Sequence, residues 1–180
     1  MTMSPGLRRL ALTAHVTTSV GWLGAVAAFL ALAVAGLAGE ASATVRGAYV
    51  AADVLTWAVI VPLCLASLLT GVVQSLGTPW GLVRHWWVLV KLVLTVAATG
   101  LLLLHTQPIS HLGDVAATGG PFGADLGGMR LQLVVDAAAA LLVLLGATAL
   151  AVVKPRGRTG LGRRPAPPPP APPRRSASVV

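Results

Sequence analysis

Four apolar stretches that contain no charged residue constrain this chain more than any other feature of its sequence. A helix needs ~20 mostly apolar residues to cross the ~30 Å hydrocarbon layer of a membrane. Two of the stretches reach that length alone, and the other two reach it once Trp86–Lys91 and Leu131–Asp136 are added, which brings Lys91 and Asp136 into the membrane. The four stretches are Leu10–Leu37, Val54–Val73, Leu92–Leu104 and Ala137–Val153.

The composition agrees with a membrane protein. Hydrophobic residues make up 56% of the chain and charged residues only 10%, against roughly one quarter charged residues in soluble domains. The predicted fold is therefore all-α, a polytopic up-down bundle of four transmembrane helices. We expect a transmembrane domain over residues 10–153, with helices at about 10–37, 49–76, 86–105 and 130–153.

Local signals refine this prediction. Pro62 lies inside the second helix, where it removes a backbone hydrogen bond and clashes with the preceding turn, so it predicts a kink. The Gly-rich connection 106–129 is expected to be irregular. Residues 1–9 form a short polar lead-in on the cytoplasmic side. Residues 154–180 are rich in Pro and Arg and predict a disordered, basic tail.

The distribution of Lys and Arg predicts the orientation. Residues 1–9, the 77–85 loop and the tail together carry ten of these cations outside the spans, whereas the opposite side carries two, Arg46 and Arg130. Segments rich in Lys and Arg stay in the cytoplasm. Both termini are therefore expected in the cytoplasm, in a multi-pass protein of the inner (plasma) membrane.

Ionisable residues inside the spans are the candidate functional residues, because each costs ~2.5–3.5 kcal/mol at the membrane centre. Lys91 and Asp136 lie near opposite faces, roughly 14 Å apart along the membrane normal, so no direct ion pair between them is expected. Depth sorts the polar residues into two layers. The outer layer contains Asp53, His105 and Asp136 with Gln132 nearby, and the inner layer contains His15, Gln74, His85 and Lys91.

Three interpretations of these layers stay open. The polar residues hydrogen-bond the helices to one another, at ~0.6–2 kcal/mol per contact. Alternatively they form a pathway for a proton or solute, since a histidine beside carboxylates can hold or pass a proton. The third interpretation is a redox module in which His15 and His85 bind haem or a metal. The sequence has neither the histidine pair at i and i+4 nor the Glu-x-x-His motif that would support such a site. The cofactor is left unknown.

Other classes of function find no support in the sequence. No P-loop, dinucleotide-binding fingerprint, nucleophile elbow or zinc-peptidase motif is present, so no enzyme and no catalytic residue is predicted. The net charge of +8 arises at helix ends and in the tail. No basic face with interleaved aromatics exists to bind nucleic acid. The single cysteine, Cys64, predicts a small apolar core residue and no cysteine-based metal site.

Three segments carry a resemblance that covers nearly all of residues 8–157. They are HVTTSVGWLGAVAAFLALAVAGL (15–37), WAVIVPLCLASLLTGVVQSLGTPWGLVRHWWVLVKLVLTVAATGLLLLHTQPISHL (57–112) and RLQLVVDAAAALLVLLGATALAVVKPRG (130–157), with SLGTPWGLVRHWWVLVK (75–91) the most specific part. In these segments the chain resembles a group of uncharacterised actinobacterial integral membrane proteins. The resemblance implies a four-helix inner-membrane protein and no established activity. It therefore transfers no functional residues.

A short pattern in the first span is faintly similar to copper-resistance-D-like bundles. It consists of a histidine, His15, followed by Gly-Trp-Leu-Gly at residues 21–24. The chain lacks the Met- and His-rich loops that copper binding favours, so this similarity transfers no copper site.

Taken together, the sequence predicts a non-enzymatic membrane bundle that acts through partners or as an oligomer. The expected partners are the lipid bilayer and either further copies of the chain or another membrane protein, and no nucleic acid. A small proton- or solute-coupled carrier and a haem- or metal-binding redox module are the alternatives.

Overall fold

The computed structural model describes residues 3–39, 42–77 and 85–153, and every element within these ranges is a helix. The elements are α1 (Pro5–Ala38), α2 (Ser42–Leu55), the π-helical turn η1 (Thr56–Ile60), α3 (Val61–Leu76), α4 (Trp86–Thr118), the 3-10 turn η2 (Ala124–Leu126) and α5 (Gly127–Val153). The predicted tail, residues 154–180, and most of the 77–85 loop lie outside the described residues.

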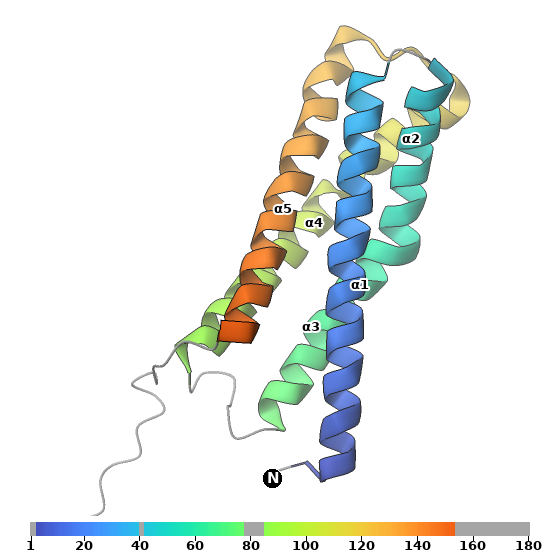
Figure 1. Ribbon diagram of the computed structural model, residues 1–180. Coiled ribbons are helices and arrows are strands. Elements are labelled where there is room, and N and C mark those ends of the chain that lie inside the picture. Colours follow the sequence, from blue (N-terminus) through green and yellow to red (C-terminus); the bar gives the residue numbers. More distant parts are fainter. Residues whose placement is uncertain (1–2, 40–41, 78–84, 154–180) are drawn as a thin grey trace, which may run out of the picture.

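Four helical rods in the described part of the chain are long and apolar enough to cross a membrane. They are α1, the continuous rod of α2, η1 and α3, then α4, and α5. α1 contacts α2, α3 and α5, and α4 contacts the same three helices (Figure 1). Rods that are neighbours in sequence are therefore neighbours in space, and the last rod packs against the first. The predicted up-down bundle of four apolar helices is confirmed.

The outward faces of the rods are apolar. Large aliphatic side chains such as Leu10, Leu69, Leu104 and Leu142 are between 66% and 76% exposed, and they come from all four rods. Exposed apolar surface of this extent is unfavourable in water but suits a hydrocarbon environment. The faces that these residues occupy are therefore the lipid-facing surfaces of a multi-pass membrane protein.

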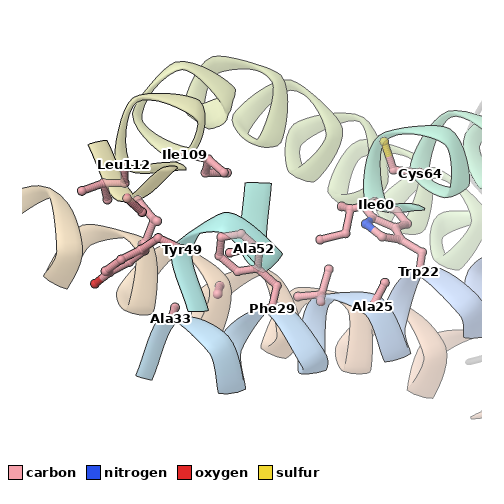
Figure 2. Close-up of a cluster of buried hydrophobic side chains, with 14 of the residues drawn as sticks. Trp22, Ala25, Phe29, Ala33, Tyr49, Ala52, Ile60, Cys64, Ile109 and Leu112 are labelled. Carbon is pink, nitrogen blue, oxygen red and sulfur yellow. The ribbon is translucent and has the colours of Figure 1, made fainter. Parts of the chain in front are cut away.

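The buried core runs between the rods. Figure 2 shows Phe29 and Ala33 of α1 packed beside Tyr49 and Ala52 of α2. Cys64 belongs to the same core, is fully buried and donates from its thiol to the carbonyl of Val61 at 3.2 Å. The prediction that Cys64 is a small core residue is confirmed.

The second rod departs from α-helical geometry directly before Pro62. The N–H of Val61 donates to the carbonyl of Thr56, five residues back, which closes a π-helical turn. The Thr56 hydroxyl, in turn, donates to the carbonyl of Ala52 at 2.8 Å. A π-turn widens the helix and re-routes the hydrogen bonds that proline disrupts. At this point of the second rod, where a kink is predicted from sequence, the structure has a π-helical turn.

The prediction of an irregular connection over 106–129 is wrong for its first half. α4 continues through Pro108 to Thr118 and ends at Gly119, whose φ of 78° is a left-handed cap. Ile109, Leu112 and Ala116 are buried at helical spacing, so core packing holds the helix together where Pro108 removes only one backbone donor. As a result, His105 lies inside α4 and not at its end.

Two other helix boundaries also lie outside the predicted ones. α1 begins at Pro5 and not at residue 10, because Ser4 caps it by accepting the N–H of Leu7 at 3.4 Å and proline fits the first helical position. The second rod begins at Ser42 and not at residue 49. At ~1.5 Å per residue, rods of this length exceed the ~30 Å hydrocarbon layer. Their ends therefore extend beyond it.

Two arginines cap helix ends at one end of the bundle, where α1 and α4 end and α2 and α5 begin (the upper end in Figure 1, hereafter the cap end). Arg130 donates to the Tyr49 hydroxyl at 2.9 Å and to carbonyls in the last turn of α1. Arg46 donates to the carbonyl of Gly119 at 3.1 Å, beyond the last turn of α4. Both guanidinium groups lie about 5.5 Å from the Phe122 ring. Cations at helix C-termini are stabilising.

Candidate functional site

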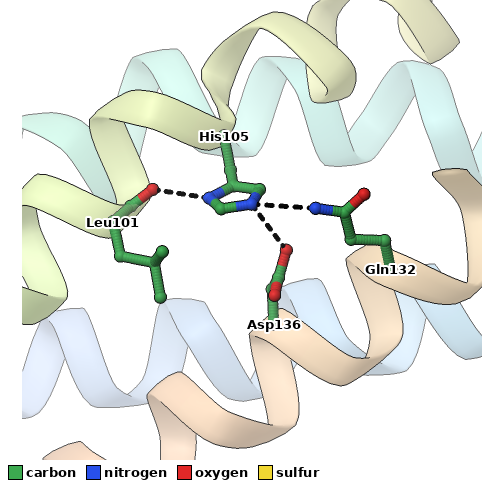
Figure 3. Close-up of polar contacts among 4 residues, drawn as sticks. All are labelled: Leu101, His105, Gln132 and Asp136. Atoms are coloured by element: carbon green, nitrogen blue, oxygen red, sulfur yellow. Dashed lines mark hydrogen bonds and ion pairs between the residues drawn. The ribbon is translucent and has the colours of Figure 1, made fainter.

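One polar cluster of the bundle is built by two helices, α4 and α5. On α5, Gln132 and Asp136 are four residues apart and therefore share one face. On α4, His105 projects toward that face, one turn after Leu101. Figure 3 shows the imidazole of His105 between the Leu101 carbonyl on one side and the Gln132 and Asp136 side chains on the other.

Three short distances define the contacts of His105. Its Nδ1 lies 2.8 Å from the carbonyl oxygen of Leu101. Its Nε2 lies 2.9 Å from the amide nitrogen of Gln132 and 3.2 Å from Oδ2 of Asp136. Both side chains of the ion pair are partly accessible, 21% for His105 and 28% for Asp136, whereas Oδ2 itself is buried.

These contacts determine where the protons lie. A carbonyl oxygen only accepts hydrogen bonds, so Nδ1 of His105 must donate to Leu101. In a neutral ring, Nε2 is then an acceptor for the Gln132 amide, and Oδ2 of Asp136 has no donor. A carboxylate oxygen and a ring lone pair repel each other at 3.2 Å. A proton on either Nε2 or the carboxylate would turn this contact into a hydrogen bond.

The pair lines a cavity of about 190 Å³ between α1, η1, α4 and α5, hereafter the central cavity. Among the described residues that line it, only Thr56, His105 and Asp136 carry polar side chains. The remaining wall is aliphatic or aromatic and includes Phe29, Ile60 and Leu133. The His105–Asp136 contact therefore lies at the edge of an apolar space in the bundle.

The third member of the predicted outer layer, Asp53, belongs to a separate cluster. Its Oδ1 accepts a hydrogen bond from the Ser110 hydroxyl at 2.8 Å, and Ser110 accepts one from the Trp57 indole at 3.0 Å. A Cβ at Gly113 would lie 2.8 Å from Cβ of Asp53, so glycine permits this close approach of α4 to α2. The structure thus joins His105 to Asp136 and pairs Asp53 with α4 at another position.

His15 and Lys91, both assigned to the inner layer, are in contact. His15 Nδ1 lies 3.2 Å from the carbonyl of Ser67 and 3.2 Å from Oγ1 of Thr70, and Nε2 lies 3.3 Å from Nζ of Lys91. Since Nδ1 donates to the Ser67 carbonyl, a neutral His15 accepts a hydrogen bond from the Lys91 ammonium. Lys91 and Asp136 therefore have different partners, as predicted from their depths.

Two further residues belong to the predicted inner layer, Gln74 and His85. Gln74 has a buried Oε1 that accepts no hydrogen bond from the described part of the chain. His85 precedes α4, and its carbonyl accepts the N–H groups of Val88 and Leu89 at 3.1 and 3.2 Å.

The contacts of His15 bear on the interpretation that this residue binds haem or a metal. Both of its ring nitrogens already contact protein groups, so ligation of haem or a metal by His15 requires one of those contacts to break. Within residues 3–39, 42–77 and 85–153, no group of three or more His, Cys, Asp or Glu side chains is placed to hold a metal ion.

Comparisons of the chain with protein families, with curated proteins and with solved structures found no match. The resemblance to actinobacterial four-helix membrane proteins and the fainter similarity to copper-resistance-D-like bundles therefore stay predictions. Any function must be argued from the geometry of the chain's own residues.

Proposed function

We propose that the chain is a small, non-enzymatic, proton-coupled carrier in which the His105–Asp136 pair exchanges its shared proton for a solute bound in the central cavity. The observation that carries this proposal is the placement of Nε2 of His105 beside both a carboxylate and an amide in the cavity wall. A proton held at such a site is in direct reach of whatever the cavity binds.

The two protonation states of the pair make different hydrogen bonds at Nε2 of His105. With a neutral ring, Nε2 accepts from the Gln132 amide at 2.9 Å. With a charged ring, Nε2 donates to Asp136, and Gln132 turns its amide over to present the oxygen. A structural contact needs only one such arrangement. A proton-exchanging site needs two, and the Gln132 amide, which carries both a donor and an acceptor, supplies the second when it is turned over.

The charge distribution supports an orientation with both termini in the cytoplasm of a cell whose inner membrane holds the protein. Ten cations outside the spans lie toward the ends of the chain and in the 77–85 loop, and such segments stay in the cytoplasm. The two exceptions, Arg46 and Arg130, cap helices at the cap end. In this orientation the cap end faces outward.

Four helices are few for a carrier that works as a monomer, so the proposal includes assembly of further copies in the bilayer. Partnership with another membrane protein, the expectation drawn from sequence, remains the alternative for a bundle whose polar contacts are only structural. A redox module has less support, because both ring nitrogens of His15 are engaged.

Proton movement in reconstituted vesicles tests the proposal. Vesicles of neutral phospholipid containing the purified protein and a lumenal pH dye are exposed to permanently charged cations, neutral solutes and anions of similar size. We expect at least one class to drive protons out of the lumen through the wild type. Asp136→Asn should abolish that movement, because a carboxamide cannot share the proton.

Asp114→Asn is the matched control, since Asp114 is exposed on the same helix as His105 and does not line the central cavity. It should leave the rate unchanged. If no solute class moves protons, or if Asp136→Asn behaves like the wild type, the carrier proposal is wrong.

A further inference from the structure

The volume and the apolar walls of the central cavity favour a solute with a small apolar group. The volume of the cavity is about 190 Å³, and an apolar protein cavity of ~150 Å³ holds benzene. A benzene ring with one small substituent therefore matches the space. The walls are aliphatic and aromatic apart from Thr56, His105 and Asp136, so the apolar part of the solute packs against apolar side chains.

The charge of the wall selects a cation. Among the described residues no Lys or Arg lines the cavity, and Asp136 supplies its only carboxylate. Once the shared proton leaves, a neutral His105 and a charged Asp136 together carry one negative charge. An anion would face that charge, and a neutral solute would leave it unpaired in an apolar space, which is unfavourable.

The other ionisable groups of the rods lie away from the cavity wall. None of them lines the cavity within the described ranges. Asp53 accepts from Ser110, Arg130 donates to Tyr49, Arg46 donates to Gly119, and Lys91 contacts His15. His105 and Asp136 are therefore the ionisable side chains that a solute meets among the described residues of this cavity.

We infer that the solute is a small aromatic or alkyl organic cation whose charged group pairs with the Asp136 carboxylate and replaces the proton shared with His105. This inference rests on the proposed function and specifies its substrate class. When the cation binds, the O–H or N–H bond of the pair breaks and the proton leaves to solvent. After the proton has left, His105 is neutral, with Nδ1 donating to Leu101 and Nε2 accepting from Gln132, and no covalent bond to the solute forms.

Benzyltrimethylammonium is the probe for this test, because its fixed charge prevents it from crossing lipid as a neutral amine. Its uncharged control is neopentylbenzene, which has the same shape with carbon in place of nitrogen. Binding to the full chain in lipid nanodiscs is followed by NMR, and proton release is followed with an indicator in weakly buffered solution. We expect the cation to bind with release of a proton, and the neutral molecule to release none.

The cation and the proton compete for the single negative charge of the pair, so the affinity for the cation should depend on pH. While the pair is protonated, the apparent Kd for benzyltrimethylammonium should rise about tenfold for each unit of acidification. Asp136→Asn should abolish both proton release and this dependence. Ala140→Leu adds bulk to the cavity wall and leaves His105 and Asp136 unchanged. It should weaken binding of the cation, and the cation that still binds should release protons as in the wild type.

The outcomes separate this inference from the proposed function. Equal binding of the cation and neopentylbenzene, or cation binding without proton release, overturns the inference. If vesicles move protons with a neutral solute or an anion but not with the cation, the inference fails and the carrier proposal stands. If the cation binds with proton release but no solute drives protons across vesicles, the inferred site stands and transport is ruled out.

Discussion

Replacing Arg130 with methionine should lower the free energy of unfolding by about 3 kcal/mol. This value combines the loss of hydrogen bonds from a charged donor with the penalty for buried acceptors that lose their donor. Arg130 donates to the Tyr49 hydroxyl and to the carbonyls of Gly36 and Leu37. Tyr49 is only 1% exposed, so water does not replace the donor at its hydroxyl. Methionine keeps most of the apolar stem, which isolates the loss of the guanidinium group.

The measurement is denaturant-induced unfolding of the purified protein in mild detergent, followed by circular dichroism. Tyr49→Phe is the matched control, because it keeps the ring and removes one acceptor, and it should cost about 1 kcal/mol. An Arg130→Met variant as stable as the wild type would show that the α1 cap contributes nothing measurable.

Replacing Gly36 with alanine should destabilise the bundle by about 2 kcal/mol, the usual cost of an extra methyl group in a packed core. A Cβ at this position would lie 2.6 to 3.0 Å from three carbons of the Tyr49 ring. That ring cannot easily move, since its hydroxyl is held by Arg130 at 2.9 Å and its face packs on Phe122 with ring centroids 5.4 Å apart.

Gly24→Ala in the same helix is the control for this substitution. A Cβ at Gly24 meets nothing within 4 Å, and alanine is the better helix former by up to ~1 kcal/mol. Thermal unfolding of both variants under identical conditions should show Gly36→Ala less stable, and Gly24→Ala equal to or more stable than the wild type. The opposite order would contradict the close approach of α1 to Tyr49.

The four spans and part of the candidate site were predictable from sequence for a simple reason. Charged residues are costly in hydrocarbon, so their absence marks each span, and helical rise converts sequence position into depth. Depth alone placed His105 level with Asp136, and helical spacing placed Gln132 on the same face. The structure shows these three residues in contact.

Asp53 shows the limit of that reasoning. It has the depth expected of the outer layer, but depth does not say which neighbouring face a side chain meets. Its partner, Ser110, lies in a segment whose Gly and Pro residues predict an irregular connection. The helix there is maintained by the burial of Ile109 and Leu112. Tertiary packing therefore overrode the local signal, and it removed Asp53 from the predicted trio.

Arg46 and Arg130 illustrate a second limit. Sequence treats both as topology charges, whereas the structure shows each donating to carbonyls at the end of a distant helix. Partners 73 and 93 residues away in sequence are set by how the rods pack. No local pattern indicates them.

Nitrogen-15 NMR of His105 tests the shared proton most directly. Histidine-labelled protein in lipid nanodiscs is titrated over its folded pH range, and the His105 signals are assigned by their loss in His105→Asn. The geometry predicts a hydrogen on Nδ1, donated to the Leu101 carbonyl, and an Nε2 signal that changes in Asp136→Asn because Oδ2 of Asp136 lies 3.2 Å from Nε2. A neutral ring with its hydrogen on Nε2, or an Nε2 signal that is the same in Asp136→Asn, would contradict the account and leave His105 as a fixed structural contact.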